Sequence, residues 1–332
     1  MTKESASTTR FGLIGTGRIT RRLVADIQST SGCEVTAVAS RTMERAQWCA
    51  SQYAIADAVQ GYENLLSRDD VDAVYLSLPP SMHRQWCVAA AEAGKSILCE
   101  KPLGMNSAEV AQIDDACRQH GVRWLDATGW LHHPRTAAFA DLIRDGRLGT
   151  VRHVSVAISF FEPFQSGEHR LQRELGGGCV LDLGWYACGV ARFAFGKPCR
   201  DVMATAVYRG DVPIRCTAVL RFDDDRSATI SCGYDTATRK WFEIAGSDAS
   251  LICDDFSRPW PDKPARCWIH DASGKVDQLD FEGHQEIRMI ETLIGEDDLA
   301  SLHAQAIDTQ AMVDAINRSL EFSSAQEPTS CI

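Results

Sequence analysis

The first 130 residues of the chain alternate short apolar runs with stretches of helical periodicity. Strands are predicted at residues 10–14, 34–40, 71–78, 96–99 and 123–128. Helices are predicted between them, at residues 18–30, 42–53, 81–93 and 106–120, with Asn106 as the cap of the last. Strands that alternate with helices of this length form parallel β-α-β units with right-handed crossovers. The pattern therefore predicts a doubly wound parallel sheet in a domain of residues 1–130.

After Pro134 the pattern changes to longer strands joined by short turns. A run of three acids, Asp223-Asp224-Asp225, is interpreted as an exposed hairpin tip in preference to a metal site. Consecutive strands with short connections indicate a mostly antiparallel sheet. The predicted fold class is α/β, with a second, α+β domain of residues 131–332 built on a large open sheet. Its strands are predicted at residues 151–161, 214–222, 228–234, 241–245, 250–254, 268–271 and 276–281, and its helices at 135–144, 179–195, 285–293 and 301–321.

The composition narrows the classes of partner. The chain has 332 residues and a formal net charge of −11, because 34 Lys and Arg residues oppose 45 Asp and Glu residues. An acidic chain without a basic block is a poor ligand for a nucleic-acid backbone. No apolar stretch approaches the roughly 18 residues of a membrane span, and the polar N-terminus lacks the apolar segment of a signal peptide. We expect a cytoplasmic protein that binds neither nucleic acid nor membrane.

Cysteines are frequent but scattered. The chain contains 13 of them, and none forms a Cys-x-x-Cys pair. In a cytoplasmic protein such cysteines are typically reduced thiols that pack as small apolar side chains. The spacing also argues against a zinc site, so no metal is expected.

A glycine-rich loop, Gly15-Thr16-Gly17-Arg18-Ile19-Thr20, follows the first predicted strand and leads into a helix. Gly15 permits a tight turn, Gly17 lets the backbone approach a pyrophosphate, and the helix N-terminus offers free N–H groups to it. Thr20 stands where the Rossmann fingerprint has a third glycine. Because the loop opens a β-α-β unit, it predicts dinucleotide binding; a glycine-rich turn without a ligand is the alternative.

The end of the second predicted strand distinguishes the two nicotinamide cofactors, because an acidic residue there binds the adenosine ribose hydroxyls. The chain instead has Ser40 and Arg41 at this point, and Arg45 follows one helical turn later. A hydroxyl and two guanidinium groups suit the 2′-phosphate of NADP, since arginine offers charged, bidentate donors. NADP is therefore the predicted cofactor, and NAD is the alternative if Arg41 only stacks on the adenine.

Further segments resemble motifs of the glucose–fructose oxidoreductase, inositol dehydrogenase and rhizopine-catabolism (Gfo/Idh/MocA) family. In chain order these are Leu78-Pro79-Pro80-x-x-His83, Glu100-Lys101-Pro102, His133-Pro134, Leu142-Ile143-x-x-Gly146-x-Leu148-Gly149-x-Val151, Leu175-Gly176-Gly177-Gly178-Cys179-Val180-Leu181-Asp182-x-Gly184-x-Tyr186 and Glu243-Ile244-x-Gly246-Ser247. The junction departs from the family, because Leu131 and His132 stand where many members have an arginine. Tyr186 replaces the histidine of many members, as in the dihydrodiol dehydrogenases, the glucose–fructose oxidoreductases and some sugar ketoreductases that it resembles.

The resemblance implies an enzyme that moves a hydride between nicotinamide and a CH–OH or C=O group of a sugar, cyclic polyol or diol. It implies that Lys101 polarises the substrate oxygen, that Tyr186 is the acid/base, and that Asp182 orients it. A phenol has an ordinary pKa of about 10, and the ammonium group of Lys101 is expected to lower the pKa of Tyr186. Asp182 lies one helical turn before Tyr186, so both are expected to face one cleft.

The resemblance implies a small sugar or polyol substrate, and a homodimer or homotetramer that covers the exposed face of the second sheet. A non-catalytic dinucleotide-binding sensor of the same fold is the alternative function, and an enzyme that recycles a tightly held cofactor is another. Beside the glycine loop and the residues after the second strand, the expected cofactor contacts are Leu78, Pro79, His83, Glu100 and Lys101.

Several other residues have two interpretations. Arg170 either contacts polar groups of the substrate or is solvated. The glycines of residues 176–178 either form a loose loop or let the backbone pass close to nicotinamide. Four aromatic residues are candidates for the pocket wall, with packing in the core as the alternative: Trp130, Phe160, Phe161 and Trp185.

Overall fold

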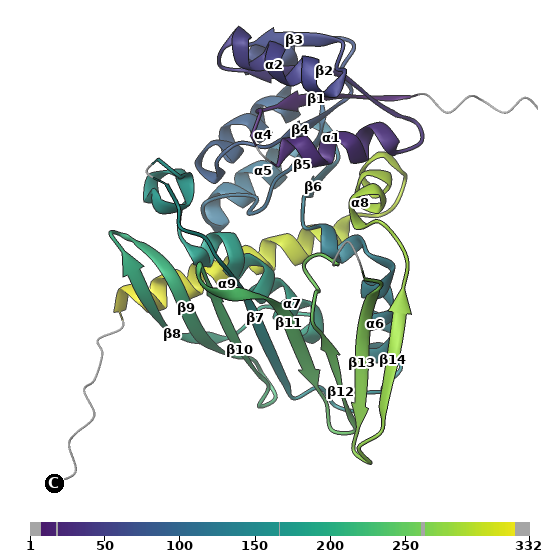
Figure 1. Cartoon of the computed structure of the whole chain (residues 1–332), viewed down its shortest axis with the longest axis vertical. Helices are drawn as coiled ribbons and strands as arrows, with labels where there is room; N and C mark the ends of the chain where they lie inside the picture. Colours follow the sequence, from purple (N-terminus) through teal and green to yellow (C-terminus); the bar gives the residue numbers. More distant parts are fainter. Residues whose placement is uncertain (1–7, 18, 166, 260–262, 323–332) are drawn as a thin grey trace, which may run out of the picture.

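The computed structural model describes residues 8–17, 19–165, 167–259 and 263–322, which form two sheets with helices packed on them (Figure 1). Within these residues the first sheet has six parallel strands in the spatial order β3-β2-β1-β4-β5-β6. They are β1 (Thr9–Ile14), β2 (Cys33–Ser40), β3 (Asp57–Gln60), β4 (Ala73–Leu76), β5 (Ser96–Cys99) and β6 (Trp124–Asp126). The helices are α1 (Thr20–Ser29), α2 (Met43–Tyr53), α3 (Tyr62–Leu66), α4 (His83–Glu92) and α5 (Ser107–His120). The predicted doubly wound parallel sheet is confirmed.

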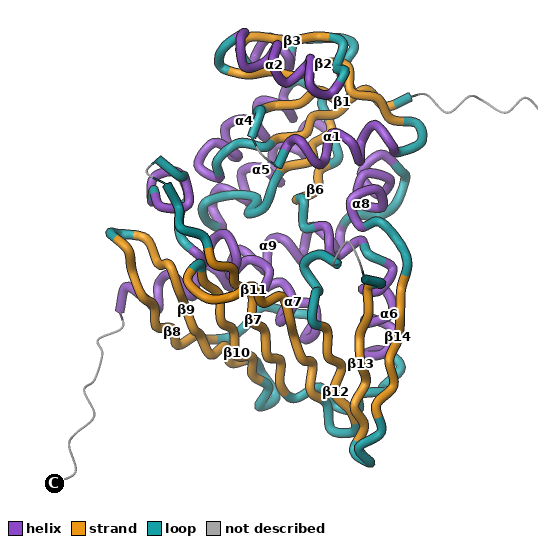
Figure 2. Tube along the Cα trace, viewed as in Figure 1, coloured by secondary structure: helices purple, strands orange, loops and turns teal. Residues whose placement is uncertain are grey.

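The second sheet has eight strands in the described residues, in the order β14-β13-β12-β11-β7-β10-β9-β8, and only β7 and β10 pair in parallel. The predicted antiparallel character is therefore confirmed. Helices α6 (Pro134–Arg144), α7 (Trp185–Phe195) and α9 (Ala300–Phe322) lie behind this sheet in Figure 2. The strands are β7 (His153–Phe161), β8 (Asp201–Arg209), β9 (Val212–Arg221), β10 (Ser227–Gly233), β11 (Asp235–Ala245), β12 (Ala249–Cys253), β13 (Ala265–Asp271) and β14 (Val276–Phe281).

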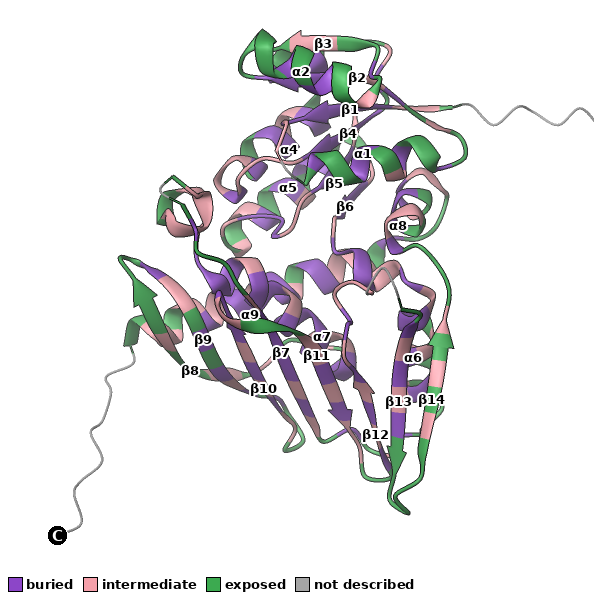
Figure 3. Cartoon of the chain, in the orientation of Figure 1, coloured by how far each residue is buried: buried purple, intermediate pink, exposed green. Residues whose placement is uncertain are grey.

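Alternate burial along the strands explains why one face of the second sheet carries the helices. Residues of β12 and β13 alternate between buried and half-buried positions, which appears as bands in Figure 3. Successive side chains of a strand point to opposite faces, so the buried set faces the helices. Phe139 of α6 packs edge-on against Phe242 of β11, with ring centroids 5.5 Å apart. The core of this half lies between the helices and the sheet.

Three elements were not predicted from the sequence. Strand β3 and helix α3 are only four and five residues long, too short to show a periodic pattern. Strand β8 is an edge strand in which most residues are half-buried or exposed, including Met203 at 60% exposure. An edge strand of this kind lacks the alternation of apolar and polar residues that marks a half-buried strand.

Helix α8 (Gln285–Ile294) returns from the second sheet to the first and lies beside α1 (Figure 1). Met289, Ile290 and Leu293 are buried in the same apolar cluster as Leu23 and Ile27 of α1. The late part of the chain therefore contributes to the core of the first sheet. As a result, one wall of the space between the two sheets is built by a helix from the end of the sequence.

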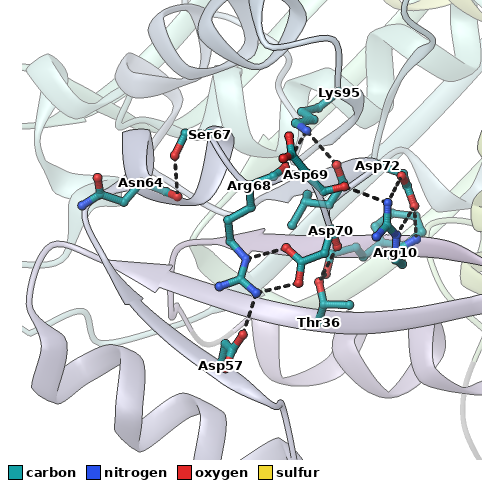
Figure 4. A network of polar contacts seen from close by, with 12 residues as sticks. Arg10, Thr36, Asp57, Asn64, Ser67, Arg68, Asp69, Asp70, Asp72 and Lys95 are labelled. Atoms are coloured by element: carbon teal, nitrogen blue, oxygen red, sulfur yellow. Dashed lines mark hydrogen bonds and ion pairs between the residues drawn. The ribbon is translucent and has the colours of Figure 1, made fainter.

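The amino-terminal edge of the first sheet is held by polar contacts around residues 68–72, the segment that leads into β4 (Figure 4). Arg68 Nη2 lies 2.6 Å from a carboxylate oxygen of Asp70 and 2.6 Å from one of Asp57. Lys95 Nζ donates to the carbonyl oxygens of Arg68 and Val71, both at 2.8 Å. These contacts lie at the amino-terminal edge of the sheet. Ligands of such sheets bind at the opposite edge, at the carboxyl ends of the strands.

Two expectations, on the cysteines and on the acidic run, agree with the structure. The described cysteines are free thiols, and all except Cys33 and Cys199 are buried. The acidic run is a hairpin tip, because Asp224 has a φ of 59° in the turn between β9 and β10 and Lys197 Nζ lies 2.9 Å from Asp223. Across the described ranges, no helix is both long enough and apolar enough to cross a membrane.

A buried ion pair joins α6 to the segment that follows β12. The side chains of Arg135 and Asp255 are each 1% exposed, and Arg135 Nη1 donates to Asp255 Oδ1. Arg135 Nη2 also donates to the carbonyl oxygens of Asp255 and Phe256, at 3.4 and 3.3 Å. Each charge is expensive to bury alone, so the pair fixes where α6 sits on the sheet.

We expect Asp255→Ala to lower the free energy of unfolding by about 3–5 kcal/mol, because it leaves the Arg135 guanidinium buried without a counter-charge. The double variant Arg135→Met, Asp255→Leu should recover most of that loss, since neither charge then remains. Urea unfolding followed by circular dichroism measures both. Equal losses in the single and double variants would contradict this account.

Candidate active site

A cleft lies at the point where the order of the first sheet reverses, between the carboxyl ends of β1 and β4. A cavity of about 660 Å³ occupies it and extends toward the second sheet. A smaller cavity of about 310 Å³ shares Ile19, Lys101 and Asp182 with it, so the two are parts of one cleft. In open sheets of this kind the crevice at the reversal point is where nucleotides bind.

The glycine loop at this cleft packs closely against the loop that follows β4. Gly15 has a φ of 106°, and a Cβ atom there would lie 2.9 Å from both the carbonyl and the hydroxyl oxygen of Ser77. Ile19 is the N-cap of α1 and supplies no side-chain capping bond, so N–H groups of the first turn remain for a ligand. A bare loop and an uncapped helix start fit the pyrophosphate of a dinucleotide.

Thr20 explains the missing third glycine of the fingerprint. Its side chain is fully buried, and its hydroxyl lies 2.5 Å from the hydroxyl of Ser77. Thr20 opens α1 and Ser77 follows β4, so this hydrogen bond joins the two loops at the base of the cleft. In the fingerprint the third glycine allows the helix to pack closely on the strand. In this chain the Thr20 hydroxyl stands at that position and joins the two loops.

Most of the predicted cofactor residues are brought together at this cleft. Gly15 and Thr16 form the turn at its base, and Arg18 lies outside the described residues. His83 is different, because it is fully buried with Nε2 2.8 Å from the Leu78 carbonyl oxygen and Nδ1 2.9 Å from that of Pro102. His83 thus joins two loops from beneath instead of facing the cleft. The predicted cofactor residues that line the larger cavity are Gly17, Ile19, Leu78, Pro79, Glu100 and Lys101.

Ser40, Arg41 and Arg45 stand at the carboxyl end of β2 and the start of α2, beside the cleft but outside both cavities. Arg41 is exposed. The Arg45 guanidinium lies 5.6 Å from the ring centroid of Trp48, and that of Arg21 lies 5.1 Å from it. Contacts of this kind hold guanidinium groups in place at an exposed site.

Lys101, Asp182 and Tyr186 line the smaller cavity together, as predicted. Lys101 follows β5, and its peptide bond to Pro102 is cis. Asp182 lies in a π-helical turn, Val180–Gly184, that runs into α7, and Tyr186 follows one turn later. Short π-helical segments frequently occur at functional sites, where they redirect a side chain.

Asp182 is the centre of the hydrogen bonds in this cluster. Lys101 Nζ donates to Asp182 Oδ1 at 2.6 Å and to its carbonyl oxygen at 2.7 Å. Arg170 Nε donates to Oδ2 at 2.7 Å, and the Tyr234 hydroxyl donates to the same oxygen at 3.1 Å. Burial alone would raise the pKa of Asp182, but Lys101 and Arg170 outweigh it and hold that pKa far below its ordinary value. Asp182 is therefore a permanent anion.

Lys101 lowers the pKa of Tyr186 as expected, but burial of the phenol outweighs this effect. Burial raises the pKa above 10, and the opposing effect of Lys101 is smaller. The Lys101 ammonium lies over the face of the Tyr186 ring, 4.6 Å from its centroid, and donates to Asp182. Burial opposes the charged form of Lys101, but the Asp182 carboxylate favours it, and the pKa of Lys101 is raised. Tyr186 therefore keeps its proton at neutral pH.

Other predictions about the pocket are resolved as follows. Phe160 lines both cavities, whereas Phe161 is 67% exposed and lines neither. Trp130 and Trp185 are each 1% exposed and lie in the core, as the packing interpretation held. Arg170 is neither solvated nor free, since it pairs with Asp182 and, at 3.2 Å, with Glu168.

The glycines of residues 176–178 are packing positions. A Cβ atom at Gly176 would lie 2.7 Å from Cβ of Pro80, and one at Gly177 would lie 2.7 Å from the carbonyl oxygen of Gln172. The segment therefore packs tightly against the loop after β4 and is not loose. Gly176 lines the larger cavity, so this contact forms part of its wall.

Two partners in the site were not found from the sequence. Tyr234 lies directly after β10, and its hydroxyl donates a hydrogen bond to Asp182. Tyr75 of β4 is fully buried and donates to Glu100 Oε1 at 2.6 Å, so it fixes the residue before Lys101. A lone tyrosine near a strand end carries no signal of its contacts, because these depend on which strand becomes its neighbour.

A reversal-point crevice next to a buried Lys–Asp–Tyr cluster is the arrangement of a nucleotide-dependent oxidoreductase. The model of the oxidoreductase family with an NAD-binding Rossmann fold matches residues 9–127. The model of the GFO/IDH/MocA C-terminal domain matches residues 136–252. The chain belongs to the Gfo/Idh/MocA family of oxidoreductases.

Relatives of known activity cover most of the chain. D-xylose 1-dehydrogenase (NADP(+)) 2 of Haloferax volcanii is 36% identical over 243 residues, 73% of this chain and 74% of the relative. The scyllo-inositol 2-dehydrogenase (NADP(+)) IolU of Bacillus subtilis is 30% identical over 262 residues, 75% of this chain and 77% of the relative. The structure of KijD10, a 3-ketoreductase from Actinomadura kijaniata in complex with NADP and TDP-benzene, aligns with a TM-score of 0.86 at 27% identity and covers 95% of this chain and 98% of that one.

We expect Asp182→Asn to destabilise the protein at pH 7 by about 3 kcal/mol, because two cations lose their buried counter-charge. The folded-state pKa of Asp182 is depressed, so its contribution is present above the unfolded pKa of about 3.9 and is lost as the pH falls through the folded value. The difference in free energy of unfolding between wild type and Asp182→Asn should therefore become smaller as the pH falls below 5. Urea unfolding at pH 7, 5 and 3.5 measures it.

Asp308→Asn is the matched control for this prediction. Asp308 pairs with Arg192 at 2.9 Å, but its side chain is 25% exposed and lies outside both cavities. A pair of this kind contributes up to about 1 kcal/mol. If the two variants lose the same free energy of unfolding with the same pH dependence, the Asp182 cluster contributes no more to stability than a partly exposed ion pair.

Proposed function

We propose that the chain is an NADP-preferring dehydrogenase or reductase, with NAD as the alternative, that acts on a CH–OH or C=O group of a sugar, cyclic polyol or diol. The observation that carries the proposal is the position of Lys101, Asp182 and Tyr186 where the cofactor crevice meets the cavity over the second sheet. The sugar and inositol dehydrogenases among the relatives support the substrate class.

The dinucleotide, when bound, supplies or accepts the hydride at nicotinamide. In this proposal Lys101 holds the substrate oxygen. A lysine ammonium has three N–H donors, and two of those of Lys101 are directed to Asp182. The third is then left for the oxygen of the reacting C–O group, where it stabilises negative charge. Asp182 fixes the ammonium through these two bonds and keeps it charged.

Tyr186 handles the proton. Its phenol is protonated at rest, so in the reductive direction it donates the Oη proton to the substrate oxygen as the carbonyl becomes a hydroxyl. In the oxidative direction the same atom must accept a proton, and the ammonium over the ring then stabilises the phenolate. The resting protonation state therefore favours carbonyl reduction.

We expect Tyr186→Phe to lower kcat by about 100- to 10,000-fold, the range of a lost general acid. The affinity for NADPH should stay within about twofold of wild type, since the phenyl ring and the Lys101–Asp182 contacts remain. Turnover of D-xylose or of its lactone, and calorimetric titration with NADPH, measure the two effects. Tyr62→Phe is the control, because Tyr62 is buried against Trp86 in the first half, away from both cavities. Wild-type turnover in Tyr186→Phe would refute the assignment.

The preference for NADP rests on the guanidinium groups at the end of β2. Arg41 and Arg45 follow Ser40 at the strand end, where the adenosine ribose lies in folds of this class. No carboxylate occupies the strand end, since the residues there are Ala39, Ser40 and Arg41. Two cations and a hydroxyl complement a 2′-phosphate, which NAD lacks.

We expect Arg41→Ala to weaken NADPH binding by about 10- to 100-fold, the value of a lost charge-assisted hydrogen bond, and to leave NADH binding within about threefold. Thermal unfolding and calorimetry with each nucleotide test it. Arg144→Ala is the control, because Arg144 is a 69% exposed arginine at the end of α6 with carboxylate partners of its own. Equal losses for NADPH and NADH would argue for adenine stacking by Arg41 and for NAD.

The alternative function is a dinucleotide-binding sensor without turnover. A sensor needs the glycine loop but not a charged lysine and a protonated phenol facing one cavity. The sensor predicts tight nucleotide binding with no hydride transfer to any sugar or polyol, in wild type and Tyr186→Phe alike. An enzyme that recycles a tightly held cofactor would differ from both, because nucleotide would copurify with active protein.

A further inference from the structure

One end of the smaller cavity is a polar pocket between α1 and α8, formed by side chains that the proposed reaction does not use. Five side chains form this α1–α8 pocket, and all of them line the cavity that also holds Lys101 and Tyr186. They come from α1, from the segment after β12 and from α8. They are Arg22, Asp26, Arg258, Gln285 and Glu286.

Three polar atoms of the pocket are buried without a hydrogen-bond partner among the described residues. These atoms are Asp26 Oδ2, Arg258 Nε and Gln285 Oε1. Gln285 is only 5% exposed, so bulk water does not replace the missing partner. Buried polar groups in folded proteins are nearly always paired, so three unpaired atoms on side chains that line one cavity indicate a group that is bound there.

The charges of the pocket decide what kind of group it takes. Glu286 Oε1 accepts from Arg258 Nη2 at 2.9 Å and from Gln285 Nε2 at 3.2 Å, and Arg22 Nη2 lies 3.9 Å away. Arg22 and Arg258 therefore balance Glu286 and Asp26, and the formal charge of the set is zero. Burial and the nearby Glu286 raise the pKa of Asp26, as expected for a carboxylate without donors. A phosphate or carboxylate gains little from a neutral set of this kind.

We propose that the α1–α8 pocket binds a neutral group that carries N–H or O–H donors beside an acceptor oxygen, either a primary carboxamide or a vicinal diol. Its donors pair with Asp26 Oδ2 and Gln285 Oε1, and its oxygen accepts from Arg258 Nε. The inference rests on the proposed function, which offers two sources of this chemistry. One is the carboxamide of nicotinamide, and the other is a pair of hydroxyls on the sugar or polyol.

Binding of NADP⁺ and of 2′-phospho-ADP-ribose, which lacks nicotinamide, distinguishes the two sources. The variant is Gln285→Met, which keeps the length of the side chain and removes the acceptor. If the pocket holds the carboxamide, the preference for NADP⁺ over 2′-phospho-ADP-ribose falls by about tenfold in titration calorimetry, while the affinity for 2′-phospho-ADP-ribose is unchanged. If it holds the diol, that preference is unchanged and the KM for D-xylose or scyllo-inositol rises by about tenfold.

Two further variants keep the test decisive. Gln310→Met is the control, because Gln310 is also fully buried with an unpaired Oε1 but lies in α9, outside both cavities. Asp26→Ala changes a half-buried position on α1 and keeps the test possible if Gln285→Met folds poorly. It should change the same readout as Gln285→Met, either the nucleotide preference or the KM. If neither the nucleotide preference nor the KM changes in Gln285→Met and Asp26→Ala, the pocket is not a binding site. If wild type binds neither nucleotide, the proposed function fails together with the pocket.

Discussion

The buried carboxylate of Asp182 is the constraint on which the site depends. It accepts hydrogen bonds from Lys101 after β5, from Arg170 before the glycine run, and from Tyr234 after β10. A carboxylate removed from water is costly unless cations and donors surround it, and each cation is costly without the carboxylate. The three segments are therefore held in one arrangement, and the two sheets meet at this cluster.

The same pairing decides the protonation states in the cleft. Lys101 remains charged because Asp182 offsets the effect of burial, and Tyr186 remains neutral because the burial of its own phenol outweighs the effect of Lys101. A lysine beside a tyrosine does not by itself produce a phenolate. Which group gains from the positive charge depends on which atom the ammonium donates to, and a sequence does not contain that geometry. The motif therefore predicted that Lys101, Asp182 and Tyr186 share one cavity, but it did not show that burial of the phenol outweighs the ammonium.

Local patterns predicted what local interactions determine. Asn106 caps α5 and the doubly wound order follows from the alternation of strands and helices, because both depend on neighbours in sequence. The short strand β3, the exposed edge strand β8 and the return of α8 to the first sheet depend on packing between distant segments. The same holds for the contact of Tyr234 with Asp182 and for the buried position of His83. A family motif can predict contacts between distant segments where such a motif exists. Most of the features named here lie outside the motifs.

Helix α8 links the apolar core of the first sheet to the α1–α8 pocket. Met289 and Ile290 pack in the same apolar cluster as α1 and fix the position of the helix. Its polar residues Gln285 and Glu286 therefore line the cavity at a fixed position. Gln285 and Glu286 belong to none of the motifs that mark the family, whereas Lys101 and Asp182 do. Substitutions in the α1–α8 pocket can therefore change the group that is recognised without disturbing the Asp182 cluster.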